Sequence, residues 1–417
     1  MTSLPSPRFS PRIRTLDKSE WPDWIGVFQE AFNEEFPPER NARFESMIEF
    51  DRSLGAFDGD QLVGTTVGCS FSMTVPGGPQ PVCGVTAVAV LPSHRRRGVL
   101  SALMRRQLAD LHESGEALAA LYASEAGIYG RYGYGRAVDN LFFDIPRRGS
   151  EFAPHAPSDP ALRVRVVKPS EAREELAKVF EAVRTTRPGL YARDEARWNG
   201  ILADDESARH GNGPQRCVIA EDDSGTRGYA LFRVKPSFTE HDVPEGEVLL
   251  SELFALDPAA YAFVWRQVLD RDLCSRLRAW NRPVDDPLMH MIAEPRMLRA
   301  GWLDEMWVRV VDVERAMTAR AYSAAADVVV EVTDPVCPWN EGRWRLSCDR
   351  EGSTWSRTTD PAELRLPASV LGAAYLGGRP LGPYHSAGVA DELRHGALRA
   401  LSSAMIWEIA PWGGLVF

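Results

Sequence analysis

Hydrophobic positions between residues 85 and 111 follow two periods in succession. Residues 85–90 are a short apolar run rich in β-branched side chains, which is the pattern of a buried strand. After Pro92, apolar residues recur at the spacing of one helix face, at Leu100, Leu103, Met104, Leu108 and Leu111. Three arginines and a glycine, residues 95–98, lie between the two patterns. This stretch predicts a strand that leads through a basic turn into a helix.

The pattern on either side of this stretch predicts one domain that ends near residue 148. Expected strands are 12–16, 54–57, 62–75, 117–123 and 141–145, and the expected first helix is 21–36. A short helix is expected after Ser124, whose hydroxyl is placed to cap it. A Pro/Ser-rich linker, residues 152–160, follows.

A second pass through the same pattern predicts a second domain, residues 149–301. Its expected strands are 163–167, 216–221, 227–235 and 247–256, and its expected helices are 171–187 and 259–273. Where the first pass has the basic turn, this one has Asp257-Pro258-Ala259-Ala260. A carboxylate there opposes the binding of an anion, so we interpret the second copy as scaffold and expect one active site per chain.

Residues 302–417 have a different pattern and predict a third domain. Its expected strands are 306–311, 326–333, 343–348 and 354–357, and its expected helices are 313–319, 367–372 and 387–404. Residues 407–417 are apolar to the last position. Because a free chain end is usually polar and frayed, we expect this end to be tucked into the protein.

Composition and charge narrow the classes of function. The 417 residues carry a formal net charge of −10, which argues against a nucleic-acid partner and favours cationic substrates. The six cysteines show no paired spacing and no histidine cluster, so neither a metal site nor a disulfide framework is expected. The sequence has no signal-type apolar core and no run of transmembrane length, which predicts a cytoplasmic protein with no membrane insertion.

The basic turn is the first candidate site. A helix N-terminus presents unpaired N–H groups and the positive end of the helix dipole, and both favour a phosphate. Gly98 lets the backbone approach an anion, and Arg95, Arg96 and Arg97 add positive charge. The alternative interpretation is a strand–turn–helix whose arginines are simply solvated.

The full string Val88-Ala89-Val90-Leu91-Pro92-Ser93-His94-Arg95-Arg96-Arg97-Gly98-Val99-Leu100 resembles the coenzyme A pyrophosphate loop of the GNAT acetyltransferase superfamily, whose consensus is Q/R-x-x-G-x-G/A. Arg95 and Gly98 match, whereas Leu100 stands where a small residue is usual. Together with the motif around Tyr129 and the chain end, the sequence resembles the enhanced intracellular survival (Eis) acetyltransferases along nearly its full length. The resemblance implies an α+β fold with tandem GNAT domains, the first active and the second degenerate, then a sterol-carrier-protein-like domain. It also implies a homohexamer.

The resemblance implies acetyl-CoA as cofactor and a set of residues that bind it. These are Val88, Ala89, Val90, Arg95, Arg96, Arg97, Gly98, Val99, Leu100, Ser101 and Ser124. In the Eis pattern, the tyrosine of the motif Ser124-Glu125-Ala126-Gly127-Ile128-Tyr129 is the general acid, and a phenol of pKa about 10 suits a departing thiolate of pKa about 8.5 to 10. Tyr132 and Tyr134 are competitors. The C-terminal carboxylate of Phe417 is the implied base.

The acceptor is expected to be a primary amine of a cationic small molecule, such as an aminoglycoside or a polyamine. Glu34 and Glu35 beside Trp24 and Phe32 would suit such a ligand at the lip of an aromatic pocket. The alternatives are that the aromatic side chains are core and the acidic pair is a solvated helix end. Two other functions stay open, a peptide-lysine acetyltransferase and a non-catalytic lipid- or CoA-binding protein.

Overall fold

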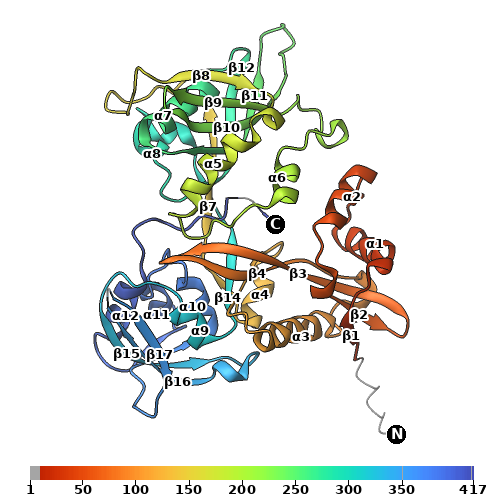
Figure 1. Ribbon diagram of the computed structural model, residues 1–417, viewed down its shortest axis with the longest axis vertical. Helices are drawn as coiled ribbons and strands as arrows, with labels where there is room; N and C mark the ends of the chain where they lie inside the picture. Colours follow the sequence, from red (N-terminus) through yellow and green to blue (C-terminus); the bar gives the residue numbers. More distant parts are fainter. Residues whose placement is uncertain (1–9, 350, 415) are drawn as a thin grey trace.

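The computed structural model describes residues 10–349, 351–414 and 416–417 (Figure 1). Within these residues the strands form two sheets of seven strands and one sheet of five. Helices cover each sheet, so the expected α+β class is confirmed. Parts of the N-terminal segment and of the apolar chain end interpreted above, residues 1–9 and 415, lie outside the described residues.

The first sheet holds the elements around the basic turn. In pairing order its strands are β1 (Arg12–Thr15), β2 (Ser53–Asp58), β3 (Gln61–Val75), β4 (Gly78–Val90), β5 (Leu118–Tyr122), β14 (Met306–Val310) and β6 (Gly135–Arg136). Its helices are α1 (Trp21–Phe32), α2 (Pro38–Ser46), α3 (Val99–Glu113) and α4 (Ala126–Tyr129). Apolar residues alternate along β4, so that Val82 packs into the cluster under α1 and Cys83 into the cluster under α3. The two helices therefore cover opposite faces of the sheet (Figure 1).

The second sheet repeats this arrangement. In pairing order its strands are β13 (Gly301–Asp304), β7 (Asp139–Pro146), β12 (Cys274–Pro283), β11 (Gly246–Ala255), β10 (Gly225–Lys235), β9 (Arg216–Asp222) and β8 (Arg163–Val167). Its helices are α5 (Arg173–Arg184), α6 (Glu195–Ile201), α7 (Pro258–Leu269) and α8 (Leu288–Met291). Cys217 and Ile219 of β9 pack under α5, whereas Val218 and Ala220 pack under α7. We call residues 12–136 the first copy and residues 139–304 the second copy.

Two strands pair in a different sheet from the one that the expected domain boundaries assign to them. β7 lies before the expected boundary at residue 148, yet it pairs with β12 and β13 in the second sheet. β14 lies after the expected boundary at residue 301, yet it pairs with β5 and β6 in the first sheet. The chain therefore crosses between the copies twice, and each copy borrows a strand from sequence beyond its expected boundary.

The third sheet forms a separate C-terminal domain, residues 313–405. In pairing order its strands are β17 (Ser353–Arg357), β16 (Gly342–Cys348), β15 (Ala326–Thr333), β18 (Leu364–Pro367) and β19 (Asp391–Glu392). Its helices are α9 (Val313–Thr318), α10 (Ala368–Ala374), α11 (Gly382–Ser386) and α12 (Ala397–Met405). A Cβ on Gly135 would lie 1.9 Å from the carbonyl oxygen of Ser369. This glycine therefore lets α10 dock directly on β6 of the first sheet.

Several expected elements differ from the structure. The expected helix 21–36 ends at Phe32, because Asn33 adopts the left-handed conformation with φ of +54° and caps α1, and a further helix, α2, begins at Pro38. The expected helix 387–404 is only α12, because Gly388 and Gly396 have φ of +72° and +88°, outside the helical region. α2, α6 and β12 were not expected from the sequence. The remaining expected strands and helices occur with shifted ends.

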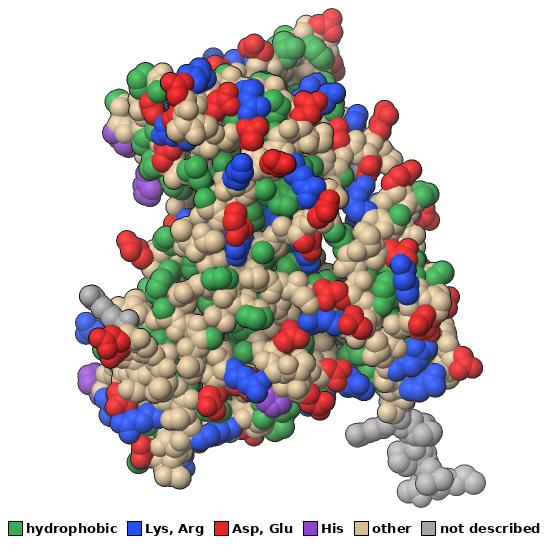
Figure 2. All heavy atoms as spheres, in the orientation of Figure 1, with side chains coloured by type: hydrophobic (Ala, Val, Ile, Leu, Met, Phe, Trp, Pro, Cys, Tyr) green, Lys and Arg blue, Asp and Glu red, His purple; other side chains and the backbone are tan. Residues whose placement is uncertain are grey.

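The cysteines and the surface charges of the described residues form no further candidate site. All six cysteines lie in the described residues, are buried and are unpaired. None of the helices in the described part of the chain combines the length and the apolar character that crossing a bilayer requires. Acidic and basic side chains are interspersed over the face shown in Figure 2, so the net charge of −10 forms no single acidic field on that face.

Candidate active site

β4 and β5 separate at the centre of the first sheet. They pair in parallel only at Cys83–Ala119 and Gly84–Ala120, although β4 continues to Val90. A bulge accompanies the separation, because Ala87 has φ of +48° and the register against β3 shifts there. The backbone of residues 88–90 therefore has no β5 partner on that side. An extended ligand arm can hydrogen-bond to such an edge, and residues 88–90 are among the residues expected to bind acetyl-CoA.

The basic turn follows β4 directly. Residues 95–98 are exposed, and Gly98 precedes α3 with φ of +90° and no side-chain cap on the helix. A Cβ at Gly98 would meet no atom within 4 Å, so the space beside the turn is open. Val99, Leu100 and Ser101 begin α3, and their amides are the donors that a helix start leaves unpaired. The turn thus has the geometry of an anion site.

The side chains around the turn are compatible with this geometry. Leu100, the departure from the consensus, packs toward the apolar cluster under α3 and leaves the amides accessible. Arg95 donates a hydrogen bond to the carbonyl of Ala31 at 3.3 Å, which ties the turn to the end of α1. Ser124 lies exposed after β5. It does not cap α4, because Glu125 occupies the cap position and no side chain bonds to the helix start, so the capping prediction is wrong.

Tyr129 ends α4 and is 5% exposed. Burial raises the pKa of Tyr129 to about 12, with smaller contributions from Tyr132 and Glu125. The phenol is therefore neutral throughout the physiological range, but it is a weaker acid than the sequence argument assumed. Complete proton transfer from a phenol of this pKa to a thiolate of pKa about 8.5 to 10 is uphill, whereas hydrogen-bond donation to such a group is not.

The two competing tyrosines are engaged in other ways. The Tyr132 hydroxyl lies 3.0 Å from the Ser101 hydroxyl, which links α3 to the segment after α4. Tyr134 is fully buried, and its hydroxyl has no hydrogen-bond partner in the described residues. Burial raises the pKa of Tyr134 far above its usual value. Of the three phenols, Tyr134 is therefore the least suited to meet a ligand.

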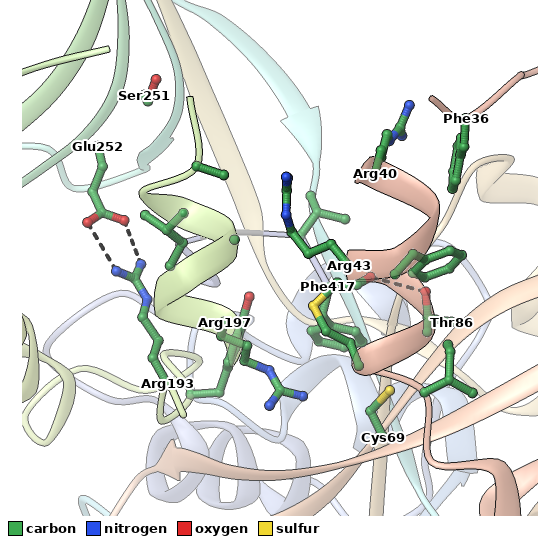
Figure 3. Close-up of a pocket in the computed structure, with 18 of the residues that line it drawn as sticks. Phe36, Arg40, Arg43, Cys69, Thr86, Arg193, Arg197, Ser251, Glu252 and Phe417 are labelled. Atoms are coloured by element: carbon green, nitrogen blue, oxygen red, sulfur yellow. Dashed lines mark hydrogen bonds and ion pairs between the residues drawn. The ribbon is translucent and has the colours of Figure 1, made fainter. Parts of the chain in front are cut away.

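The chain end lies at the separated strands. The Thr86 hydroxyl of β4 donates a hydrogen bond to a terminal oxygen of Phe417 at 3.1 Å (Figure 3). The Phe417 ring packs against Phe71 at 4.6 Å, Tyr122 at 4.9 Å and Tyr191 at 5.5 Å between ring centroids. Residues 411–414 are buried and Phe417 is half-buried, as expected for an end tucked into the protein, whereas Val416 is 52% exposed. The chain end delivers a carboxylate to β4.

Buried polar groups anchor the approach of the chain end. The Trp412 indole packs into the cluster under α5, and its N–H lies 3.0 Å from the Asn281 side-chain oxygen. The Asn281 side-chain amide donates to the Gly414 carbonyl. Glu305 accepts from the Gly413 amide at 3.2 Å. Asn281 of the second copy and Glu305, which directly precedes β14, therefore fix residues 412–414 before the chain reaches Phe417.

A cavity of about 740 Å³ opens beside Phe417 (Figure 3). Its wall comes from α1, α2, β3 and β4 of the first copy and from α6, β10 and β11 of the second. The lining includes an aromatic group, Phe28, Phe32, Phe36, Phe44, Phe71, Tyr191 and Phe417. This volume is typical of a pocket for a small organic ligand.

Only two of the four expected substrate-binding residues line the cavity. Phe32 and Glu34 line the cavity, and Glu34 is paired with Arg40 at 3.3 Å. Trp24 is 1% exposed and packs between Trp21 and Phe28, so it is core. Glu35 is exposed and is not among the lining residues. The acidic pair at the lip of the pocket therefore reduces to one carboxylate that is already paired.

Other lining residues were missed by the sequence analysis. Arg43 of α2, Arg193 and Arg197 around α6, and Glu252 of β11 all face the cavity. Arg193 clamps Glu252 with hydrogen bonds of 3.0 and 2.6 Å, and both side chains are buried. These residues carry no local motif, and only the packing of the two copies brings them together.

Comparison with known proteins identifies the family. Residues 12–137 and 189–310 each match a model of the acetyltransferase (GNAT) domain, and residues 313–414 match the sterol carrier protein domain. The chain is 33% identical over 372 residues to N-acetyltransferase Eis of Mycobacterium tuberculosis, an alignment that covers 85% of this chain and 87% of the relative. The chain belongs to the Eis family of GNAT acetyltransferases.

Other relatives agree with the Eis family. The chain is 44% identical over 404 residues to an uncharacterized N-acetyltransferase of Streptomyces avermitilis, covering 96% and 98% of the two chains. The crystal structure of Eis1 from Mycobacterium abscessus superposes with a TM-score of 0.82 at 32% identity, covering 97% of this chain and all of that one. A GCN5-related N-acetyltransferase from Anabaena variabilis shares the fold, with a TM-score of 0.83 at 18% identity.

Membership in the Eis family fixes the class of reaction. The protein is an acetyl-transferring enzyme with two GNAT domains and a sterol-carrier-protein-like domain. GNAT acetyltransferases use acetyl-CoA in general. The open turn at Gly98 and the separated strands β4 and β5 are compatible with that ligand, because one offers amides to a diphosphate and the other an edge to an extended arm.

Proposed function

We propose that this Eis-family enzyme is an acetyl-CoA-dependent N-acetyltransferase that acetylates a primary amine bound in the cavity at Phe417. One observation carries the proposal. The hydroxyl that holds the terminal carboxylate belongs to Thr86, and residues 88–90, proposed to bind the thioester arm, follow on the same strand. A proton acceptor for the amine is thus built next to the segment where the acetyl group would lie.

Acetyl-CoA supplies an activated acetyl group when it is bound. The amine enters as an ammonium ion, and the Phe417 carboxylate holds it and accepts its proton directly or through water. The free amine nitrogen then attacks the thioester carbonyl carbon, so that a C–N bond forms and the C–S bond breaks. The products are the acetamide and CoA thiol, with one proton released to solvent. Backbone amides of residues 88–90 would polarise the thioester carbonyl. One such donor lowers the activation barrier by about 3 kcal/mol.

Tyr129 is the proposed donor to the leaving sulfur. Its phenol stays protonated because burial raises its pKa to about 12. A neutral phenol can donate a hydrogen bond to sulfur as negative charge develops there, and this lowers the barrier without complete transfer of the proton. The proton that the thiolate finally takes can come from water or from the amine.

The size and aromatic wall of the cavity support a small-molecule acceptor. A polycation such as an aminoglycoside or a polyamine was the expectation from the net charge of −10. The wall of the cavity does not favour it, because arginines outnumber glutamates among the lining residues. A lysine of a peptide stays a second candidate acceptor.

Thiol release from acetyl-CoA tests the proposal. The wild-type enzyme should release CoA thiol on addition of at least one primary amine from a panel of kanamycin, spermidine, arylethylamines and a lysine peptide. A variant with Gly-Ser-Gly added after Phe417 should lose at least about a hundredfold in kcat/KM, because the terminal carboxylate moves away from Thr86.

The matched control carries the same three residues at the N-terminus and should keep wild-type activity. Equal thermal unfolding temperatures would exclude a folding defect in the extended chain. Full activity of the C-terminal extension would overturn the role of the carboxylate. No thiol release with any amine, in a protein that still binds CoA by calorimetry, would instead favour a non-catalytic binding protein.

A further inference from the structure

The charge of the acceptor cavity points to a substrate class. Five arginines line it, Arg40, Arg43, Arg193, Arg197 and Arg233, against two glutamates, Glu34 and Glu252, and the terminal carboxylate. Three carboxylates that pair with these arginines, Asp194, Asp204 and Asp205, are not among the lining residues. The cavity therefore presents guanidinium groups inward while much of the compensating negative charge lies behind them.

Two of the lining arginines bond to partners within the second copy. Arg193 is clamped by Glu252 and stacks on the Phe180 ring at 3.6 Å. Arg233 pairs with Asp204 and also donates to the Gly213 carbonyl at 3.1 Å. Arg193, which uses both terminal nitrogens on Glu252, therefore has a structural role in the second copy. Arg233 bonds through Nη1 alone, and its Nε and Nη2 have no partner in the described residues.

Arg197 has donors to spare. Only one of its guanidinium nitrogens, Nη1, bonds to Asp194, and within the described residues Nε and Nη2 have no hydrogen-bond partner. Its side chain is 18% exposed and lines the cavity. Unused N–H groups of a charged side chain in a narrow cavity favour a ligand that supplies acceptor oxygens.

The position of Arg197 relates it to the chain end. Its guanidinium carbon lies 4.1 Å from the centroid of the Phe71 ring, and the Phe71 ring packs on Phe417 at 4.6 Å. No ion pair within 4 Å joins Arg197 to the terminal carboxylate among the described residues. The cavity thus places a positive group and the terminal residue that carries the carboxylate against the same aromatic ring, Phe71.

Arg43 adds a second positive group beside Arg197. It belongs to α2, pairs with Asp205 through Nη2 alone, and leaves Nε and Nη1 without a partner in the described residues. Its Cδ lies 3.9 Å from a Cβ built on Gly200, which is one turn after Arg197 on α6. The first copy and the second copy therefore each contribute one arginine with unused donors to the same wall (Figure 3).

We infer that the acceptor is a zwitterion, a primary amine joined through an aromatic or aliphatic spacer to a carboxylate or another oxyanion. This inference rests on the proposed N-acetyltransferase function. The ammonium end binds the Phe417 carboxylate, where the transfer described above takes place. The spacer packs on Phe71 and the neighbouring rings, and the oxyanion accepts hydrogen bonds from Arg197 and Arg43. The reacting atoms and their balance are unchanged.

A matched series of acceptors tests the inference. The three acceptors share one arylethylamine. Phenethylamine carries no further charge, 4-(2-aminoethyl)benzoate adds a carboxylate, and 4-(aminomethyl)phenethylamine adds a second ammonium group. The wild-type enzyme should prefer the carboxylate over the neutral amine by at least about tenfold in kcat/KM, mainly through KM. The dication should be the poorest of the three.

Two variants locate the effect. Arg197→Gln should lose most of the preference for the carboxylate, and Arg197→Glu should reverse it in favour of the dication. Arg173→Gln is the matched control, because Arg173 pairs with Glu195 at the start of α6 but does not line the cavity. Arg173→Gln should keep the wild-type preference. If Arg197 variants fail to fold, Arg43→Gln carries the same expectation.

Each result decides the question. Acetylation with equal or better use of the dication, kanamycin or spermidine by the wild-type enzyme would overturn the zwitterion assignment and leave the N-acetyltransferase function standing. An unchanged preference in a folded Arg197→Gln variant would overturn the role of Arg197. Absence of thiol release with every amine would overturn the proposed function itself, and the inference with it.

Discussion

The two GNAT copies differ most where a strand passes into a helix. In the first copy, the parallel ladder between β4 and β5 ends after two residue pairs, and the strands separate. In the second copy, the equivalent ladder between β11 and β12 runs over five pairs, from Gly246 to Leu250. β11 nevertheless continues to Ala255 without a β12 partner, as β4 continues to Val90 without a β5 partner. Both copies therefore separate these strands, and the second ladder is only longer.

The helix starts of the two copies differ more clearly. α3 begins after Gly98 with no side-chain cap, whereas α7 is capped by Asp257. One oxygen of Asp257 accepts from the amides of Ala259 and Ala260, each at 3.0 Å, and the other pairs with Arg227 at 2.9 Å. The protein's own carboxylate occupies the amides that a diphosphate would use. The degenerate state of the second copy is therefore an anion site filled from within.

The comparison also shows what the second copy contributes. Residues 189–192 pair with β3 through Gly189, Tyr191 and Ala192, and Arg197 and Arg193 follow directly on the far wall of the cavity. The anchor residues of the chain end, Trp412 and Gly414, also bond to Asn281 of the second copy. The second copy fills its helix-start amides with Asp257 but still builds the acceptor side of the cavity.

The largest expected difference between the copies is the effect on kcat of removing a tyrosine hydroxyl from each. Tyr129→Phe removes the proposed donor to the leaving sulfur and should lower kcat by about a hundredfold or more while leaving the dissociation constant of CoA within about twofold. Steady-state thiol release and calorimetry measure the two quantities.

Tyr261→Phe in α7 is the control for that experiment. Its hydroxyl donates to Asp286, a buried structural bond, so this change should lower stability but not kcat. If both variants have wild-type turnover, Tyr129 is not the donor. If Tyr261→Phe alone lowers turnover, the second copy is not scaffold.

A smaller effect is expected at the positive-φ glycines. Gly98 has φ of +90° and Gly225 in the second copy has φ of +118°, and a Cβ at either would meet no atom within 4 Å. Alanine should cost about 1 kcal/mol of stability at each site through backbone strain. Only Gly98→Ala should also raise KM for acetyl-CoA, by about tenfold, because its Cβ stands where the diphosphate would approach.

The pair of alanine variants separates strain from binding. Thermal unfolding reports the strain at both positions, and the KM for acetyl-CoA reports the groove. Equal KM values for both variants would contradict an anion site at the turn after β4.

The smallest effect on catalysis is expected at Glu305, where the chain returns from the second sheet to the first. Burial raises the pKa of Glu305 to about 8, and the nearby Asp139 adds to the shift. Between about pH 4.3 and 8 the unfolded chain releases this proton while the folded protein retains it, so stability falls as the pH rises, by up to about 1.4 kcal/mol per pH unit. Glu305→Gln removes this dependence.

Glu305→Gln and the wild type should therefore unfold at similar temperatures at pH 5. The variant should be more stable than the wild type at pH 8 to 9, with little change in kcat at pH 7. A constant difference between the two proteins across this pH range would show that Glu305 does not titrate with a raised pKa.

Much of this fold could be predicted from the sequence because it depends on local patterns. The passage from β4 to α3 is visible as a change from an apolar run to helical spacing, and the repeat of that passage near Asp257 reveals both the duplication and the loss of the anion site. The prediction of a helix over residues 387–404 was wrong because two glycines in the left-handed region interrupt an otherwise helical pattern. β12 was missed because its alternating exposed arginines hide a buried face.

The sequence by itself determined the family, the phosphate-type turn, the candidate tyrosine and the apolar chain end, since each is a run of neighbouring residues. The hexamer and the cytoplasmic location stay predictions. Only the tertiary structure decided that β7 and β14 exchange between sheets, that Phe417 bonds to Thr86, and that arginines from both copies face one cavity. Those contacts join residues more than a hundred positions apart, and no local pattern records them, because they follow from how the two copies pack.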